Sequence, residues 1–424
     1  MSRFIINGGR RLSGVYAPAG NKNAVLPMLA ACVLTDEPVT LDNLPLIDDV
    51  RAMLAILDGL GVAVALHDHT VTLCARGLRR SRLDPELCRR VRSSILFAGP
   101  LTARLGRATL APPGGDVIGR RRLDTHFDGL RTLGIEATGG RQFTFRRRKL
   151  EGAAIVLDEA SVTATENVLM AAVLAKGRTV IFNAACEPHV LDLGLLLNKM
   201  GARIEGLGTN RLEIEGVERL SGASHEIQPD TIEIGSFVAA AAATGGDLSV
   251  SGVPFEPLWI IGKAFQKLGI RMDLDGHALR VPARQHLRIR RDFGAAIPKI
   301  DDGPWPMFPS DLMSVSIVAA TQAHGSILFF EKMFESRMYF VDYLAGMGAT
   351  IVVCDPHRVL VTGPSRLHGT HMASPDIRAG MALLIAALCA KGESIIDNAQ
   401  TIDRGYEAID VKLRSLGADI VREE

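Results

Sequence analysis

A short phrase, Leu or Met followed by Gly, recurs six times along the chain at nearly even spacing. The glycines are Gly61, Gly134, Gly201, Gly269, Gly348 and Gly417, separated by steps of 73, 67, 68, 79 and 69 residues. Near-equal steps of this size indicate a chain built by repetition of one supersecondary unit. Each pair follows a helical pattern and precedes a strand, so each glycine is expected to end a helix.

A second pattern lies inside each repeat: small or polar residues, an Ala-rich apolar stretch, and then a β-branched strand. The stretch SVTATENVLMAAVLAKGRTVIF from Ser161 is one example. Because these stretches are apolar on nearly all sides, we expect helices buried inside a layer. Segments such as 179–182 and 327–330 fit buried strands. The helix that closes each repeat, as in 49–60, is more amphipathic.

Six units of one αβ design predict an α/β fold of two lobes with three units each. The seam between units three and four lies near 226–229, and the Pro/Gly turn at 17–20 marks a second crossing. We therefore expect a first lobe over residues 21–229 and a second lobe over 1–20 with 230–424. The N-terminal strand 3–7 would then belong with the last units.

The bulk composition excludes several classes of protein. With 48 basic and 47 acidic residues, the net charge of +1 does not favour a nucleic-acid partner. No apolar run is long enough for a membrane partner, and the first residues lack a signal peptide. Six cysteines without C-x-x-C spacing predict reduced, mostly buried thiols and a cytoplasmic location. No cluster with metal-ligand spacing is visible, so no metal is expected.

The starts of the buried helices carry polar residues that a plain core would not need. They include Asn21 to Asn23, Arg92 to Ser94, Ser161 to Thr165, Asp230, Asp311, and Asp376 to Arg378. Capping alone can explain the Ser, Thr, Asn and Asp residues. A cation at a helix start opposes the dipole, however, so Lys22, Arg92 and Arg378 favour a bound anion.

Segment 112–126 holds the densest run of reactive side chains. The turn-forming PPGG is followed by Asp116, three arginines at 120–122, Asp124 and His126. A Gly-rich loop with an acid and arginines suits a lid over an anionic substrate. A solvated surface loop is the alternative interpretation, and His126 by itself is more typical of a structural histidine.

Together these segments resemble the enolpyruvyl transferases, in particular those acting on UDP-N-acetylglucosamine. The matching pieces are GNKN at Gly20, VRSSI around Arg92, PPGGDVIGRR from Pro112, SVTATEN at Ser161, EPHVLD at Glu187, FPSD ending at Asp311, FESR ending at Arg337, DIRAG at Asp376, and IDRGYE around Arg404. The resemblance implies a two-lobed inside-out α/β barrel with its active site between the lobes. It also implies transfer of the enolpyruvyl group of phosphoenolpyruvate to the 3′-hydroxyl of UDP-N-acetylglucosamine, the first committed step of peptidoglycan synthesis.

The resemblance also implies roles for individual residues. Asp116 would be the acid that protonates the methylene carbon and Asp311 the base at the sugar hydroxyl, with Lys22 and Arg404 completing the catalytic set. Phosphoenolpyruvate would be held by Lys22, Asn23, Arg121 and Arg404. UDP-N-acetylglucosamine would contact Asn23, Arg92, Arg121, Arg122, Leu123, Asp124, Thr125, Glu159, Ala160, Ser161, Val162, Asp311 and Met333. Arg337, Asp376 and Arg378 would belong to the second lobe's share of the cleft. No cofactor is implied.

Three positions depart from the common family pattern. Most members carry Cys where Asp116 stands, although some carry Asp. Because a carboxylate is a poorer nucleophile than a thiolate, we expect insensitivity to fosfomycin. Glu159 and Thr163 replace a Lys and a Gly beside the diphosphate. These departures leave open a paralogue with another acceptor, either another nucleotide or a shikimate-type acid. A non-catalytic nucleotide-sugar-binding regulator is a further alternative, although such a protein would need no acid–base pair.

Overall fold

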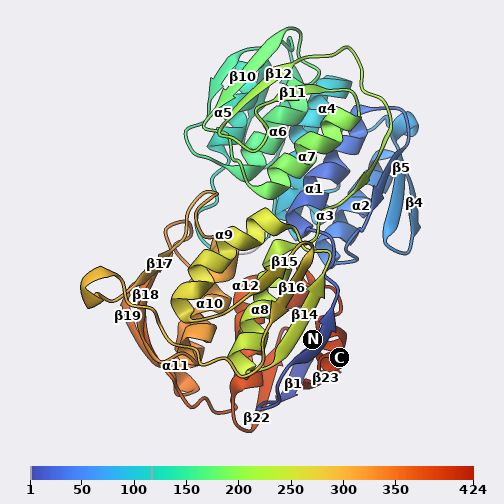
Figure 1. Cartoon of the computed structure of the whole chain (residues 1–424). Helices are drawn as coiled ribbons and strands as arrows, with labels where there is room; N and C mark the ends of the chain where they lie inside the picture. The colour runs from blue at the N-terminus through green and yellow to red at the C-terminus, as the bar shows by residue number, and fades with distance from the viewer. Residues whose placement is uncertain (1, 116–117) are drawn as a thin grey trace. The chain divides into compact units, whose positions relative to one another are not determined.

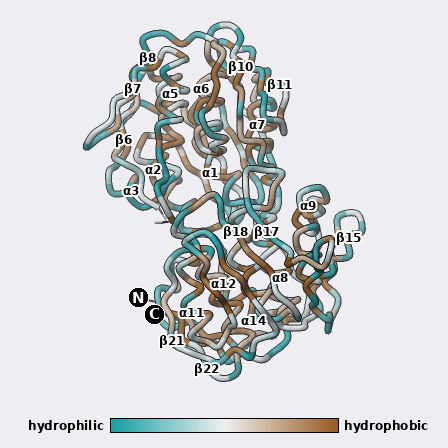
Figure 2. The backbone as a smooth tube through the Cα atoms, turned by 90° about the vertical axis from the view of Figure 1, so that its left-hand side faces the viewer, coloured by the Kyte–Doolittle hydropathy of each residue, from teal (hydrophilic) through white to brown (hydrophobic). Residues whose placement is uncertain are grey.

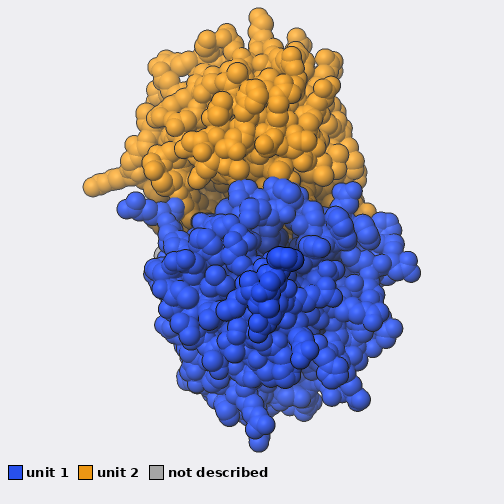
Figure 3. Space-filling model, turned by 60° about the vertical axis from the view of Figure 1, so that its left-hand side comes forward, with its two compact units in different colours: residues 1–19, 117–120, 229–424 blue, residues 20–116, 121–228 orange. Residues whose placement is uncertain are grey.

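The computed structural model describes residues 2–115 and 118–424, which form two compact units (Figure 1). Counting described residues, unit 1 contains 2–19, 118–120 and 229–424, and unit 2 contains 20–115 and 121–228 (Figure 3). The crossings at 19/20 and 228/229 each lie one residue before the predicted lobe boundary. Residues 118–120, which we assigned to the first lobe, count with unit 1 because Ser336 N–H donates to Ile118 O over 3.2 Å.

Unit 2 contains three αβ repeats. Its helices are α1 (Lys22–Ala31), α2 (Asp48–Leu60), α3 (Pro85–Arg90), α4 (Ala98–Leu105), α5 (Asp124–Thr132), α6 (Val162–Ala172) and α7 (Pro188–Lys199), with 3-10 helices η1 (Cys32–Leu34), η2 (Ala75–Gly77) and η3 (Arg92–Phe97). Its strands are β3 (Val39–Asp42), β4 (Ala63–His67), β5 (Thr70–Cys74), β6 (Arg107–Leu110), β7 (Ile135–Thr138), β8 (Phe143–Arg147), β9 (Ala154–Val156), β10 (Arg178–Phe182), β11 (Arg203–Glu205), β12 (Arg211–Glu215) and β13 (Ala223–Glu226).

Unit 1 repeats the design. Its helices are α8 (Thr231–Thr244), α9 (Phe255–Phe265), α10 (Met313–Thr321), α11 (Val341–Gly346), α12 (Ile377–Cys389), α13 (Gln400–Asp403) and α14 (Ile409–Ser415), with η4 (Gln266–Leu268), η5 (Phe293–Ala295) and η6 (Ser310–Leu312). Its strands are β1 (Arg3–Asn7), β2 (Ser13–Tyr16), β14 (Asp247–Ser251), β15 (Asp273–Asp275), β16 (Ala278–Val281), β17 (Lys299–Asp301), β18 (Gly325–Phe330), β19 (Thr350–Asp355), β20 (Arg358–Gly363), β21 (His371–Ala373), β22 (Glu393–Asp397) and β23 (Asp419–Glu423).

Five of the six sheets among the described residues share one strand order. An edge strand pairs in parallel with the strand that follows a buried helix, and two antiparallel strands complete the sheet. In the sheet β6-β8-β7, the parallel edge is reduced to a bridge between Arg82 and Thr109. In the last repeat, β1 lies between β22 and β23, which confirms that the N-terminal strand belongs with the last units.

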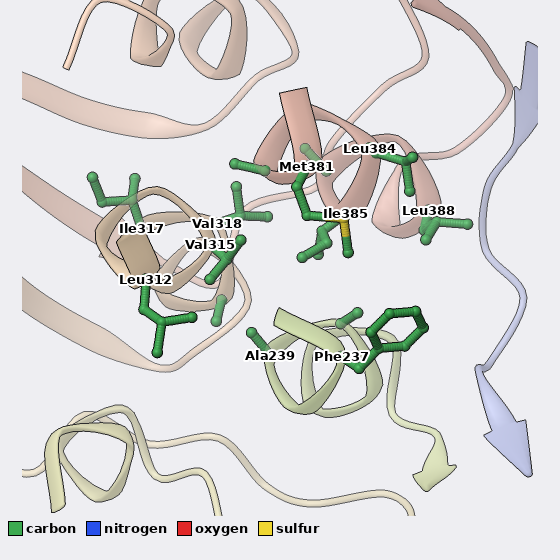
Figure 4. Close-up of a cluster of buried hydrophobic side chains, with 14 of the residues drawn as sticks. Phe237, Ala239, Leu312, Val315, Ile317, Val318, Met381, Leu384, Ile385 and Leu388 are labelled. Atoms are coloured by element: carbon green, nitrogen blue, oxygen red, sulfur yellow. The ribbon is translucent and has the colours of Figure 1, made fainter. Parts of the chain in front are cut away.

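The core of unit 1 is a cluster of three helices, α8, α10 and α12, that are buried on all sides. Figure 4 shows buried side chains of the three helices, among them Phe237 of α8, Val318 of α10 and Met381 of α12. The apolar character runs along α8 and α12 in Figure 2. In unit 2, α1, α4 and α6 take the equivalent places. The prediction of helices buried inside a layer is therefore confirmed.

The six Leu/Met-Gly pairs end their helices as predicted. Gly61, Gly134, Gly201, Gly269, Gly348 and Gly417 have φ angles of 95°, 87°, 99°, 77°, 101° and 95°. A left-handed residue at this position is most easily supplied by glycine, which has no Cβ to clash. One backbone requirement thus accounts for the period of the sequence.

Two predictions need correction. The loop predicted over 112–126 ends earlier, because Asp124 already begins α5. Of the six thiols, Cys32 and Cys88 are buried, three are intermediate and Cys354 is exposed, so the cysteines are free but not mostly buried. Among the described residues, no helix has the length and apolar character needed to cross a lipid bilayer.

The three-helix core of unit 1 generates a stability prediction. Ile317 is fully buried, and replacing it with Ala should lower the free energy of unfolding by about 2–5 kcal/mol, because a cavity forms among packed helices. Ile297→Ala is the matched control, since that side chain is 56% exposed and should change stability little. Both tryptophans, Trp259 and Trp305, lie in unit 1, so denaturant unfolding followed by tryptophan fluorescence reports this unit.

Candidate functional site

Lys22 begins α1 in unit 2 and has a carboxylate partner within the protein. Its Nζ lies 2.9 Å from Asp49 Oδ2, and the two side chains are only 9% and 8% exposed. The N-cap Asn21 accepts hydrogen bonds from the backbone N–H groups of Asn23 and Ala24, so the start of α1 is held rigidly. Asp49 is thus a partner of Lys22 within the protein, and a bound anion at Lys22 stays a prediction.

Arg92 differs from Lys22 because no acidic side chain is paired with it among the described residues. It begins the 3-10 helix η3, not the α-helix that we expected. Its guanidinium donates to the carbonyl oxygen of Arg121. Burial, and to a lesser extent the charge of Arg121, lower the pKa of Arg92 to about 10. A partly buried cation beside another cation favours an anion, so a bound anion at Arg92 stays a prediction.

His126 anchors a directed chain of hydrogen bonds in unit 2. Asn167 Oδ1 accepts from Gly99 N–H at 2.6 Å, so its Nδ2 must be the atom that donates to His126 Nδ1 at 3.1 Å. The other ring nitrogen, Nε2, then carries the hydrogen and donates to Thr163 Oγ1 at 3.0 Å. Burial, with a smaller contribution from Arg92, lowers the pKa of His126 to about 3. His126 is therefore a neutral structural histidine.

The predicted residues from Glu159 to Val162 lie at the N-terminus of α6. Ser161 caps this helix by accepting from Ala164 N–H at 3.4 Å. The side chain of Thr125 donates to Asp158 Oδ1 at 2.5 Å and lies 3.5 Å from Glu159 Oε1. Since Thr163 accepts from His126, its own hydroxyl hydrogen is available to an acceptor outside this network.

The remaining predicted residues of this region contribute less to the group. Arg122 forms an exposed ion pair with Asp124 at 2.6 Å, and Leu123 precedes α5. Ala160 lies just before the N-cap of α6. Asp116, the predicted acid, lies outside the described residues.

Asp311 is the centre of the polar group in unit 1. Arg378 donates from Nε and Nη2 to Asp311 Oδ2, at 2.9 and 2.7 Å. Arg337 Nη2 donates to Asp311 Oδ1 at 3.1 Å. Both arginines are almost fully buried, at 6% and 3% exposure, whereas the Asp311 side chain is 26% exposed. Two guanidiniums thus hold the carboxylate ionised and oriented.

Arg378 is positioned by the start of α12. Asp376 caps this helix, accepting from the N–H groups of Arg378 and Ala379 at 2.8 and 2.9 Å. Burial acts to lower the pKa of Arg378, but Asp311, Tyr406 and Asp230 raise it above its usual value. Asp311 is thus a partner of Arg378 within the protein, and a bound anion at Arg378 stays a prediction.

The sequence analysis missed Glu331 and Asp302, which lie beside this group. The Glu331 carboxylate accepts from Met333 N–H at 3.0 Å, and its Oε2 lies 3.7 Å from Arg337 Nε. Both acids directly follow strands, a pattern that could have identified them.

Two further predicted residues lie in unit 1. Met333 is 40% exposed, and Arg404 is half-buried at the end of α13.

The His126 network generates a prediction about acid stability. A histidine in the unfolded chain takes up a proton near pH 6.5, whereas folded His126 stays neutral down to about pH 3. Its contribution is thus intact above pH 6.5 and declines as the pH falls below that value. Between pH 6.5 and pH 5, the unsubstituted protein should lose about 2 kcal/mol of its free energy of unfolding through His126. His126→Gln should not show this loss.

Denaturant unfolding at both pH values measures the effect. His371→Gln is the control, because the His371 side chain is 61% exposed and should leave the pH dependence unchanged. Equal pH dependence in His126→Gln and the unsubstituted protein would contradict the neutral assignment.

Comparison with known proteins assigns the chain to a family. The family model for EPSP synthase (3-phosphoshikimate 1-carboxyvinyltransferase) matches residues 6–413. UDP-N-acetylglucosamine 1-carboxyvinyltransferase from Bradyrhizobium diazoefficiens is 53% identical over 421 residues, covering 99% of this chain and 98% of that protein. The protein of the same name from Treponema denticola is 52% identical over 425 residues, covering 100% of both.

Solved structures show the same fold. The enolpyruvyl transferase NikO from Streptomyces tendae aligns with a TM-score of 0.88 at 24% identity, covering 99% of this chain and 98% of NikO. EPSP synthase from Acinetobacter baumannii aligns with a TM-score of 0.75 at 18% identity, covering 100% of both chains. The chain is a transferase of the enolpyruvyl transferase family and belongs, within it, with the UDP-N-acetylglucosamine 1-carboxyvinyltransferases.

Proposed function

We propose that the protein transfers the enolpyruvyl group of phosphoenolpyruvate to the 3′-hydroxyl of UDP-N-acetylglucosamine and releases phosphate. The observation that carries this proposal is the identity above 50% with enzymes of that name over the full length of the chain. Asp311 and the arginines that orient it supply a base of the kind that the reaction needs.

The reaction needs two proton movements and a way to hold negative charge. Addition of the sugar hydroxyl to phosphoenolpyruvate requires a base at the hydroxyl and an acid at the methylene carbon; loss of phosphate then gives the enol ether. Asp311 is ionised and partly exposed, so it can accept the hydroxyl proton. Asp116 is the proposed acid. Lys22, Asn23, Arg121 and Arg404 are proposed to bind the phosphate and carboxylate of the donor.

In unit 2, Arg92 and the N-terminus of α6 suit the nucleotide sugar. Arg92 is a cation without an acidic side-chain partner among the described residues, and the N-terminus of α6 offers N–H groups and a positive dipole end. The Thr163 hydroxyl can donate a further hydrogen bond where many relatives carry glycine. Glu159 is exposed, and its carboxylate lies near Thr125, so repulsion of phosphate depends on which way this side chain turns.

The alternatives have weaker support. An acceptor of the shikimate type would align the protein with EPSP synthase, but the solved example is only 18% identical. NikO, an enolpyruvyl transferase, is only 24% identical, so it gives no reason to prefer another acceptor. A regulator without catalysis would have no use for a base oriented by two buried arginines.

The proposed reaction places the protein in cell-wall synthesis. Its product would enter peptidoglycan assembly, which links the protein to cell shape, growth and division. Both proposed substrates are cytoplasmic metabolites, so we propose a cytoplasmic location. Phosphoenolpyruvate and UDP-N-acetylglucosamine would be its partners, with no nucleic acid or membrane involved.

Phosphate release from phosphoenolpyruvate tests the function directly. UDP-N-acetylglucosamine should drive release far better than shikimate 3-phosphate or UMP, because only this acceptor offers both the diphosphate and the sugar hydroxyl. Mass spectrometry of the product should show the added enolpyruvyl group. Equal or faster turnover with either competitor would exclude the proposed acceptor.

Position 116 generates a prediction about inhibition. Fosfomycin alkylates a cysteine in members of this family, and a carboxylate at this position is a much poorer nucleophile. The protein should therefore resist time-dependent inactivation, whereas Asp116→Cys should stay active and become sensitive. Asp116→Ala, which has neither acid nor nucleophile, should lose most activity and serves as the control. A fosfomycin adduct on the Asp116 peptide of the unsubstituted protein would contradict the prediction.

A further inference from the structure

Asp302 and Glu331 lie side by side beyond the ends of two parallel strands in unit 1. Strands β17 and β18 pair in parallel with Asp301 opposite Phe330, so the next residue of each strand is an acid. Both acidic residues are completely buried. Buried carboxyl groups at such strand ends are unusual unless something stabilises them.

The hydrogen bonds around the two acids leave one oxygen without a protein donor. Glu331 accepts from Ser310 Oγ at 2.9 Å and from Met333 N–H at 3.0 Å. Asp302 Oδ1 accepts from Lys332 N–H at 2.5 Å, but the buried Asp302 Oδ2 has no donor among the described residues. Asp302 lies beside Glu331 in the register of the two strands, and hydrogen bonding and charge from Asp302 raise the pKa of Glu331. Because ionised carboxylates only accept, a hydrogen bond between the two acids requires one proton.

A shared proton also reduces the negative charge around the neighbouring arginines. The carboxyl groups of Asp302, Glu331 and Asp311 lie near Arg337 and Arg378, and the charge of Asp230 also acts on Arg378. One proton held by the acid pair removes one of these negative charges. Losing that proton would add a negative charge in a buried environment, which is strongly unfavourable.

The other charged groups close to the pair have their own contacts. Lys332 Nζ pairs with Asp301, and His357 Nδ1 lies 2.7 Å from the carbonyl oxygen of Glu331. Burial, followed by the contact with Asp302, raises the pKa of Glu331 to about 9. The proton is therefore held at neutral pH and released in alkaline solution.

We propose that Asp302 and Glu331 act as a proton-sharing pair that positions Arg337 and, through it, the base Asp311. With the proton in place, Arg337 contributes a hydrogen bond of 3.1 Å to Asp311, while its Nε stays 3.7 Å from Glu331. Loss of the proton gives Glu331 a full charge, which draws Arg337 away from Asp311. The inference rests on the proposed function of Asp311 as the base, and both acids are positioning residues.

The rate constant kcat as a function of pH tests this role. In the unsubstituted protein, kcat should decline in alkaline solution as the pair ionises. Glu331→Gln and Asp302→Asn each replace the shared proton with an amide N–H and keep the same net charge. Both variants should have a near-normal kcat at neutral pH, and their alkaline decline should move up by at least about one pH unit. The KM for UDP-N-acetylglucosamine should change little.

Two reference variants define the scale. Asp311→Asn removes the base and should lower kcat by about 10²–10⁴-fold at all pH values. Glu233→Gln alters another buried acid of unit 1, whose pKa is raised by burial and whose partner is Lys412. It should keep the normal alkaline decline. Thermal unfolding checks that each variant is folded; if Glu331→Gln is not, Asp302→Asn carries the test.

An infrared measurement separates this inference from the proposed function. The difference spectrum between the unsubstituted protein and Glu331→Gln at neutral pH should contain the band of one protonated carboxyl, and the band should vanish in alkaline solution. If phosphoenolpyruvate and UDP-N-acetylglucosamine give no product, the proposed function fails while the band still reports the shared proton. Absence of the band, or an unshifted alkaline decline of kcat in both amide variants, would overturn the proposed pair.

Discussion

The burial of helices that have no polar face determines where this protein can carry chemistry. In α8, α10 and α12 almost every side chain is buried, so a polar group along the helix needs a partner within the protein, as Ser236 has in the Tyr406 hydroxyl. Polar side chains are tolerated at the helix starts, where free backbone N–H groups need acceptors. Asp230 and Asp376 meet that need as N-caps. Strand ends are the other such place, and Glu331 occupies one of them.

The buried charges follow from the same constraint. A charge beside an apolar core must have a partner, and Lys22 with Asp49 and Arg378 with Asp311 satisfy this within the protein. Buried ion pairs often contribute little net stability, since desolvation offsets most of the attraction between the charges. Their presence at helix starts is therefore better explained by function. Asp311 illustrates this: its carboxylate is partly exposed while both of its arginine partners are buried.

Periodic features of the fold could be predicted from the sequence, whereas pairings between distant residues could not. The Leu/Met-Gly phrase predicted the repeats because each glycine meets a local backbone requirement. The N-caps at Asn21, Ser161, Asp230 and Asp376 were likewise local signals. The partner of Arg378 lies 67 residues away in sequence, so no local pattern identifies it. The Asp302–Glu331 contact depends on strand register, which the sequence alone did not reveal.

The position of β1 has a consequence for the order in which the chain can fold during synthesis. Unit 2 has all of its strands once β13 has emerged and paired with β3. By contrast, β1 is among the first segments made, yet its partners β22 and β23 are among the last, with Arg3 opposite both Asp397 and Glu423. Until then the backbone N–H and C=O groups of β1 are unpaired and could form β-sheet hydrogen bonds with another chain. On the ribosome, unit 2 can therefore complete its fold while unit 1 still waits for the final residues.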